Sequence, residues 1–545
     1  MGWGPQHQQA GRRTSRITLI VSAVVLILLV AVPRATGLLV GVALLVGLVR
    51  VGRWWWRRAD PALQARVRAR LGSPGRPWRA SPATRGAAAG EAARDVVQQM
   101  RGQGPGVYLG LTEGGDRRRA RWERAVLILG PPRSGKTSGV IIPSLLCHPG
   151  PVVSTSTKPD VLATTKHARG ELGTVWQFDP TGTTSAVDGV EVLRWSPVLC
   201  SGEWDGALLM ARAMVTGAGV GTGTSDANHW TRRAQALLAP LLHAAAVGGL
   251  QIGDVVDWIA RHELDQPGAL ITEHHGAPLA AGQLVGLQNT EARERSSIFS
   301  ACADALDAYT SQAGLAAASE PNFFPGRFVT SQDTIYIHAP AEHQHLAAPL
   351  VCGLLAEIRR ATYDHYRNGT LPTPVLFALD EVANIAPIAE LPQIASEGAS
   401  QGLLLLAALQ DLSQARVRWG QAADGFLTLF GTKLLLSGIA DHATLEAVSV
   451  ALGEYDRQMV SHTRPHGAGV FSAAAAATGF GSHPAPARPS TTYSTQRTRV
   501  LSPGEIANLP AGHALHLDGV RWELLRLTPA HTTEPWRTLT QPTAE

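Results

Sequence analysis

Cysteine is scarce in this chain of 545 residues. The four cysteines are far apart, and none forms the closely spaced pair that a structural zinc site requires. A disulfide framework is excluded as well, because such frameworks depend on dense, regularly spaced cysteines. We therefore expect free, buried thiols in a reducing compartment at Cys147, Cys200, Cys302 and Cys352.

Charged and aromatic residues are also few, at 17% and 6%, whereas 45% of the residues are hydrophobic. This composition excludes a disordered chain, which is poor in apolar residues. The net charge of +5 is compatible with an anionic partner, but arginines gather in residues 50–80, beside apolar segments. Basic residues there serve membrane topology and lipid headgroups, so charge alone does not predict DNA binding.

Two segments near the N-terminus, 17–33 and 35–49, contain no charged residue and are separated by Arg34. As one helix they would span about 50 Å, more than the roughly 30 Å of a bilayer core. The sequence therefore predicts two short transmembrane helices, about 17–33 and 35–52, with both basic flanks in the cytoplasm. A single span followed by an interfacial segment remains an alternative.

Residues 130–137 read GPPRSGKT. An apolar run precedes them, as expected of a buried parallel strand, and a helical segment follows that Pro143 is expected to kink. Strand, glycine loop and helix together predict a P-loop, in which Lys136 reaches the β- and γ-phosphates and Thr137 binds Mg²⁺. The predicted nucleotide-binding residues are Gly130, Pro131, Pro132, Arg133, Ser134, Gly135, Lys136, Thr137 and Ser138.

An acidic pair follows the apolar run in PVLFALDE, residues 374–381. Asp380 is expected to hold Mg²⁺ through water, and Glu381 to polarise the attacking water. Gln410 ends a later apolar run, where it could sense the γ-phosphate. The predicted cofactors are ATP and Mg²⁺, and the predicted catalytic residues are Lys136, Glu381 and Gln410.

Further short apolar runs predict more buried strands, at 151–156, 174–179, 334–339, 403–410 and 433–438. With the two strands described above, they predict an α/β fold: a RecA-like parallel sheet of a P-loop NTPase, with ligands at the carboxyl ends of the strands. Residues 203–318 carry helical periodicity and almost no strand signal, which predicts an inserted all-α domain.

The sequence thus divides into predicted segments. They are a membrane anchor (1–58), a basic, flexible linker (59–106), the RecA-like domain (107–202 and 319–460), the all-α insert (203–318), a low-complexity linker (461–496) and a C-terminal tail element (497–545).

Together these features resemble the type IV coupling proteins, the TraG-type ATPases of bacterial conjugation. The resemblance rests on the membrane hairpin, GPPRSGKTSGVIIPSLL, TKPD, FDP, RWSP, TIYIHAP, the stretch from LDEVANIAPIAELPQIASEGASQG to LQD, and VLSPGEIANLPAGHALHLDG. It implies a homohexameric motor in the cytoplasmic (inner) membrane, multi-pass, with most of the chain in the cytoplasm. It also implies that Gln410 contacts nucleotide.

The implied partners are single-stranded, relaxase-bound DNA, the relaxase, type IV secretion channel proteins and the membrane. One departure concerns an arginine that the family commonly places before the Gln410 strand, where this chain has Ala399. Arg416 and Arg418 are the candidates to replace it.

We therefore predict an ATP hydrolase that translocates DNA and couples a relaxase–DNA substrate to a type IV secretion channel during conjugation. Two alternatives remain open: a septal-type double-stranded DNA translocase, and an ATP-binding membrane adaptor for protein secretion without DNA.

Overall fold

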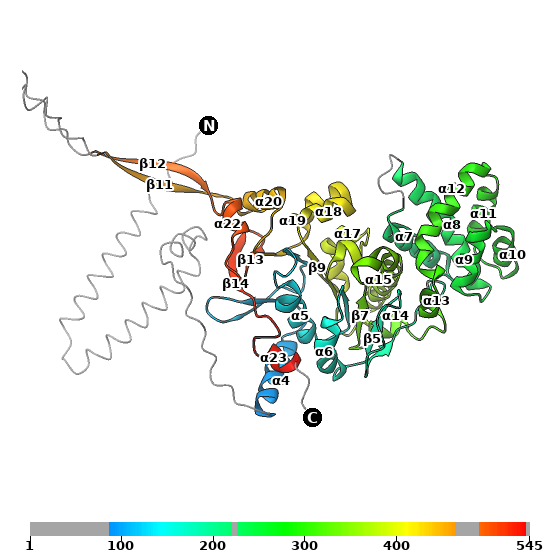
Figure 1. Cartoon of the computed structure of the whole chain (residues 1–545), viewed down its shortest axis with the longest axis horizontal. Coiled ribbons are helices and arrows are strands. Elements are labelled where there is room, and N and C mark those ends of the chain that lie inside the picture. Colours follow the sequence, from blue (N-terminus) through cyan, green and yellow to red (C-terminus); the bar gives the residue numbers. More distant parts are fainter. Residues whose placement is uncertain (1–86, 221–225, 464–489, 541–545) are drawn as a thin grey trace, which may run out of the picture. The chain divides into compact units, whose positions relative to one another are not determined.

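A mixed β-sheet of twelve strands forms the centre of the part of the chain that the structure describes. The computed structural model describes residues 87–220, 226–463 and 490–540 (Figure 1), all within one compact unit, Arg79–Glu545. The strand order is β2-β1-β14-β13-β10-β3-β9-β8-β4-β7-β5-β6. The strands are β1 (Tyr108–Leu111), β2 (Arg117–Arg119), β3 (Val126–Leu129), β4 (Val152–Ser156), β5 (Val175–Phe178), β6 (Glu191–Val192), β7 (Thr334–His338), β8 (Val375–Leu379), β9 (Leu403–Leu409), β10 (Thr432–Leu436), β13 (His513–Asp518) and β14 (Arg521–Arg526).

The predicted membrane helices, 17–33 and 35–52, lie outside the described residues. Among the residues that are described, no helix combines the length and the apolar character needed to cross a membrane.

All seven strands predicted from apolar runs are present, as β3, β4, β5, β7, β8, β9 and β10. They pair in parallel with one another, and most of their side chains are buried on both faces of the sheet. Continuous apolar runs form such strands because helices cover both faces of a parallel sheet.

The sheet is not wholly parallel, which corrects the prediction. β13 pairs antiparallel with β10, and β14, β1 and β2 extend that edge with further antiparallel pairs. The segment taken as a separate tail from residue 497 therefore completes the central sheet. Its strands, HALHLD and RWELLR, mix apolar and polar residues and so lack the continuous apolar pattern of the inner strands.

Helices cover the two faces of the sheet, and the sheet separates two hydrophobic cores. On one face, α4, α5, α6 and α23 pack against side chains such as Val126 and Ile128. On the other face, α7 and α15 pack against side chains such as Leu127 and Leu129. These helices are α4 (Ala87–Gly102), α5 (Ile142–Cys147), α6 (Asp160–Gly170), α7 (Trp204–Ala218), α15 (Gln344–Arg367) and α23 (Trp536–Thr540).

Between β6 and β7 the described residues form helices only (Figure 1, green). After α7 these are α8 (Ala227–Val247), α9 (Ile252–Arg261), α10 (Asp265–Glu273), α11 (Pro278–Gln288), α12 (Ala292–Ala303), the 3₁₀ helix η2 (Asp304–Thr310), α13 (Gln312–Ala318) and α14 (Pro325–Phe328). α8 contacts α7, α9, α10, α11 and α12, so it is the central helix of this group. Its residues Leu237–Ala245 are buried, whereas its two ends are partly exposed.

The remaining helices lie in the segments that connect the strands from β7 to β13. They are η3 (Ala341–His343), α16 (Val382–Ile385), α17 (Leu391–Glu397), η4 (Gly398–Gln401), α18 (Leu412–Trp419), η5 (Gly420–Gly425), α19 (Phe426–Leu429), α20 (His442–Leu452) and α22 (Pro503–Ala507).

Two local expectations need correction, and a third concerns Pro143. The segment 59–106, expected to be a flexible linker, contains α4, which buries Val97 and Met100. The segment 461–496, expected to be low-complexity linker, contains the ends of an exposed two-stranded ribbon, β11 (Glu454–Thr463) and β12 (Ser490–Arg499). Pro143 lies in the first turn of α5, directly after a π-helical turn, η1 (Thr137–Ile141). The helix is therefore irregular beside the proline expected to disturb it.

The structure confirms that all four cysteines are free, buried thiols. Burial raises the pKa of the Cys147 thiol to about 12, so this side chain packs as a small apolar group.

Candidate nucleotide-binding site

The P-loop connects β3 to η1 in a conformation suited to bind an anion. Its turn depends on Arg133 and Gly135, which have φ values of 64° and 97°. A Cβ at Gly130 would lie 2.7 Å from Ser134 Oγ and 2.9 Å from Leu436 Cβ, so only glycine fits there. Within the described residues, the Ser134 hydroxyl is buried without a hydrogen-bond partner. Such an unpaired donor in a glycine loop suits a phosphate oxygen.

Lys136 is 6% exposed and folds back over this loop. Its Nζ donates to the carbonyl oxygens of Gly130 at 2.5 Å and Pro131 at 3.3 Å. These two neutral acceptors leave the ammonium charge uncompensated by any direct ion pair among the described residues. The lysine therefore lies where an added phosphate would gain the most electrostatic stabilisation.

Thr137 and Asp380, the residues predicted to hold Mg²⁺, meet directly. Thr137 Oγ1 donates to Asp380 Oδ2 at 2.6 Å, although 243 positions separate the two residues. The contact forms because the P-loop follows β3 and Asp380 follows β8, and both strands end at the same edge of the sheet. Burial raises the pKa of Asp380, and the Thr137 hydroxyl and the Lys136 charge oppose this shift. A hydroxyl and a carboxylate in this arrangement are the ligand types that Mg²⁺ uses in P-loop proteins.

Glu381 occupies an unusual backbone conformation, with φ at 50° and ψ at 44°, directly before α16. Non-glycine residues seldom adopt this left-handed region, and those that do are enriched at functional sites. Its Oε2 is buried and has no hydrogen-bond partner within the described residues. Burial raises the pKa of Glu381, whereas the Lys136 charge lowers it. A partly desolvated carboxylate with a free oxygen can orient a water molecule and accept its proton.

Gln410 follows β9 beside this carboxylate. Its side chain forms a hydrogen bond with Glu381 that lowers the pKa of the acid, and its backbone N–H donates to Gln414 Oε1 at 2.9 Å. The structure thus brings Lys136, Thr137, Asp380, Glu381 and Gln410 together.

Sequence reasoning missed the residues that contact the backbone of the P-loop and of Asp380 and so support the site. The Thr155 hydroxyl of β4 donates to the backbone oxygen of Asp380 at 2.8 Å. The backbone N–H of Ala530 donates to the Ser138 carbonyl at 2.8 Å, and Leu527 packs against Gly135 and Gly139. The glycine at position 139, early in the predicted helix, is the signal that another segment approaches closely.

The three residues considered for a contact between subunits lie apart from the loop. Ala399 belongs to η4, and Arg416 and Arg418 belong to α18. Arg416 Nε lies 3.1 Å from Asp424 Oδ1, and its NH1 lies 3.9 Å from Asp441 Oδ2. Arg418 is exposed and forms no ion pair with the described residues.

The fold and the geometry of this site are those of a P-loop NTPase with a mixed, largely parallel sheet. Comparison with solved structures identifies the particular fold as that of TrwB, a bacterial conjugative coupling protein. Its unbound form, TrwBΔN70, matches with a TM-score of 0.56 and 17% identity over 79% of this chain and 91% of that chain. TrwB in complex with ADP and Mg²⁺ matches with a TM-score of 0.54 and 18% identity, over 79% and 92%. TrwB with the non-hydrolysable ATP analogue ADPNP gives 0.55 and 17%, over 79% and 92%.

The sequence itself matches one family model. Residues 374–511 match the family described as the TraM recognition site of TraD and TraG. No curated protein gives a significant match. The family match and the shared fold confirm the predicted resemblance to the type IV coupling proteins.

Proposed function

We propose that this chain is a membrane-anchored, ATP-driven DNA translocase: a coupling protein that recruits a relaxase–DNA substrate and delivers it to a type IV secretion channel during conjugation. The observation that carries this proposal is the meeting of Lys136, Thr137, Asp380 and Glu381 at one edge of the sheet. The fold that positions them is shared with TrwB, whose structures hold ADP with Mg²⁺ and an ATP analogue.

ATP and Mg²⁺ fit the donor set at this edge. The loop amides, the unpaired Ser134 hydroxyl and the Lys136 ammonium would hold the phosphates, and Thr137 with Asp380 would hold the metal ion. When bound, Mg²⁺ neutralises phosphate charge. Glu381 holds the attacking water and accepts its proton through the free Oε2, and Gln410 fixes the position of that carboxylate.

The partners follow from the same resemblance. Residues 374–511 begin with β8 and include Asp380, Glu381 and Gln410, and their family is described as recognising TraM. A partner bound to this segment would therefore lie close to the hydrolytic residues. We propose a homohexamer in the cytoplasmic membrane that contacts DNA, a relaxase and channel proteins, because a ring lets successive subunits pass on one strand.

The function is tested by ATP hydrolysis of the full chain in detergent, with and without DNA. We expect single-stranded DNA to raise kcat severalfold. We expect Lys136→Ala to reduce hydrolysis by about 10²-fold or more, because the ammonium over the loop is removed. Lys166→Ala is the matched control, since the Lys166 ammonium donates to the Asp188 carbonyl on the surface.

Each other outcome points to a different protein. Stimulation by double-stranded DNA alone favours the septal-type translocase. Hydrolysis without any DNA binding at low salt favours the protein-secretion adaptor and contradicts the translocase, since phosphate contacts give nucleic-acid binding its salt dependence.

Membrane topology gives a second test. We expect reporter fusions at the N-terminus and directly after Arg58 to locate both positions in the cytoplasm, because arginines flank both apolar segments. A fusion after residue 106 serves as the control for the side on which the folded body lies. Reporters on opposite sides of the membrane would exclude the hairpin and leave a single span.

A further inference from the structure

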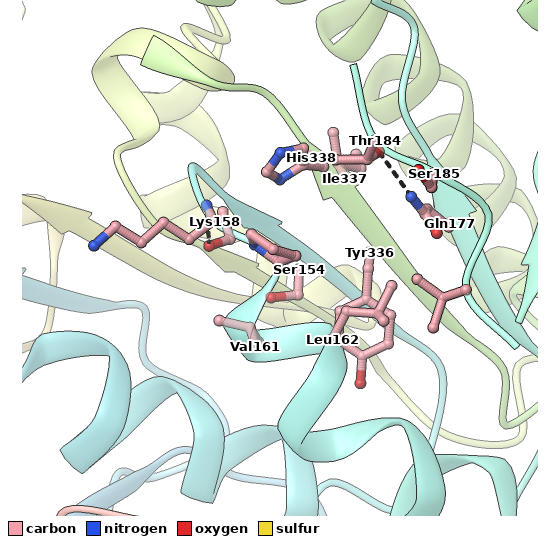
Figure 2. A pocket seen from close by; sticks show the side chains of 13 residues that line it. Ser154, Lys158, Val161, Leu162, Gln177, Thr184, Ser185, Tyr336, Ile337 and His338 are labelled. Carbon is pink, nitrogen blue, oxygen red and sulfur yellow. Dashed lines mark hydrogen bonds between the residues drawn. The ribbon is translucent and has the colours of Figure 1, made fainter. Parts of the chain in front are cut away.

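A separate cavity of about 220 Å³ lies between α6, the strands β4, β5 and β7, and the loop that follows β5 (Figure 2). Ser154, Tyr336 and Gln177 are direct neighbours across these three parallel strands, because Tyr336 is in register with both of the others. Val161 and Leu162 of α6 cover them. The volume is well above the roughly 10–15 Å³ that one water molecule requires.

Three buried polar atoms of this cavity have no hydrogen-bond partner within the described residues: Ser154 Oγ, Gln177 Oε1 and His338 Nδ1. Their side chains are 1%, 6% and 9% exposed. Gln177 Nε2 donates to Thr184 Oγ1 at 2.8 Å, which leaves its Oε1 as a free acceptor (Figure 2). Buried polar groups in native proteins are nearly always paired, so these three atoms require polar partners inside the cavity.

The polar lining inside the cavity is neutral. Burial lowers the pKa of His338, so its imidazole is uncharged near neutral pH. Asp179 is an acid in the loop that follows β5. Its carboxylate already accepts hydrogen bonds from the hydroxyls of Thr181, Thr183 and Thr184. The buried part of a ligand is therefore uncharged, with both donor and acceptor atoms.

The remaining lining combines apolar side chains with the hydroxyls of Ser156, Thr184 and Ser185, and one lysine lies at the rim. The Tyr336 hydroxyl pairs with Thr165 on α6, so its ring offers the cavity only an apolar surface, beside Val187 and Ile337. Lys158 at the rim is exposed and points away from the interior (Figure 2). It forms no ion pair with the described residues.

We propose that this cavity binds the base of a nucleotide, whose phosphate lies outside the cavity on the side of Lys158. A nucleobase is flat and uncharged and carries donors and acceptors along its edge, and proteins bind isolated bases between apolar side chains and such polar groups. The nucleotide is either free or part of a single strand. The site goes beyond the proposed function, because it is separate from the P-loop.

The cavity is lined by β4, which pairs with β8, the strand that precedes the hydrolytic residues Asp380 and Glu381. Ser154 and Ser156 line the cavity, and Thr155 between them donates its hydroxyl to the backbone oxygen of Asp380. A base bound against β4 therefore contacts the strand that supports the acidic pair.

The test uses the full chain with Lys136→Ala, which removes nucleotide binding at the P-loop. Two probes are compared under ultraviolet light: free 5-bromodeoxyuridine monophosphate and a 20-nucleotide oligodeoxynucleotide that carries one 5-bromodeoxyuridine. We expect cross-linked peptides to contain residues of β7 or α6, next to the Tyr336 ring. Gln177→Leu should lower the yield about tenfold, since it removes the buried acceptor at nearly constant volume.

Ser154→Leu, which fills the cavity, is a second variant, and Gln332→Leu is the matched control on the exposed end of the sheet. Thermal unfolding confirms that each variant folds. Cross-linking by the oligonucleotide alone assigns the base to a DNA strand, and cross-linking by the monophosphate alone assigns it to a free nucleotide. Absence of cavity cross-links with both probes, or yields unchanged in both variants, shows that the cavity holds only water and overturns the proposal. Neither result depends on whether DNA stimulates hydrolysis in the parent chain.

Discussion

Glu381→Gln should reduce the rate of ATP hydrolysis by about 10²–10⁴-fold while nucleotide binding is retained. Glutamine keeps the volume of the side chain and its hydrogen bond with Gln410 but cannot accept a proton from water. The Thr137–Asp380 contact and the Lys136 ammonium remain in place, so affinity for the nucleotide is preserved. Single-turnover hydrolysis and equilibrium binding of a non-hydrolysable analogue measure the two effects separately.

Glu397→Gln is the control, because Glu397 is an exposed acid on the neighbouring α17 and does not contact the site. A Glu381→Gln protein that hydrolyses ATP as fast as the parent would show that another group accepts the proton.

The pH dependence of the parent enzyme gives an independent check on the same carboxylate. A base acts in its deprotonated form, so its rate falls as the pH drops below its pKa. Burial raises the pKa of Glu381 above its ordinary value of 4.5, so the acidic limb of the kcat profile should lie above pH 4.5. Loss of this limb in Glu381→Gln would assign it to this residue rather than to Asp380.

The sequence predicts the central sheet well because its inner strands are short, continuous apolar runs. Two such strands place Thr137 and Asp380 at one edge, and their contact follows from parallel pairing. The sequence does not predict the antiparallel edge, because β13 and β14 mix polar with apolar residues. In addition, β13 pairs with β10, from which the ribbon β11–β12 separates it along the chain.

The supporting contacts of the site are harder to predict, since they join positions without a pattern. Nothing in the sequence near Leu527 and Ala530 indicates that this segment packs on η1. The cavity residues Ser154, Gln177 and His338 each resemble an ordinary polar residue of a strand. Only the register of β4, β5 and β7 gathers them on one face beneath α6.

A contact between subunits gives the second large effect. If the chain forms a ring, a positive group of one subunit can reach the nucleotide of the next, and such arginines contribute about 10³-fold or more to the rate. Ala399 cannot serve, and Arg416 is paired with Asp424 and Asp441 within its own chain. Arg418 is exposed on α18 and follows Val417, which is 76% exposed. An exposed apolar residue next to an arginine that forms no ion pair within the described residues suits a subunit interface, so we expect Arg418 to act across it.

Arg418→Ala should therefore abolish most hydrolysis under ring-forming conditions, whereas Arg416→Ala should change it little beyond the loss of its surface ion pairs. Mixing then separates a contribution between subunits from one within a subunit. A Lys136→Ala subunit binds no nucleotide but keeps Arg418, so it should restore hydrolysis when combined with an Arg418→Ala subunit that binds ATP. Restoration requires the arginine of one chain to act on the nucleotide of its neighbour, because neither parent subunit of the mixture is active alone. Normal hydrolysis by Arg418→Ala on its own would place the positive group elsewhere, or leave a ring whose subunits hydrolyse ATP without one.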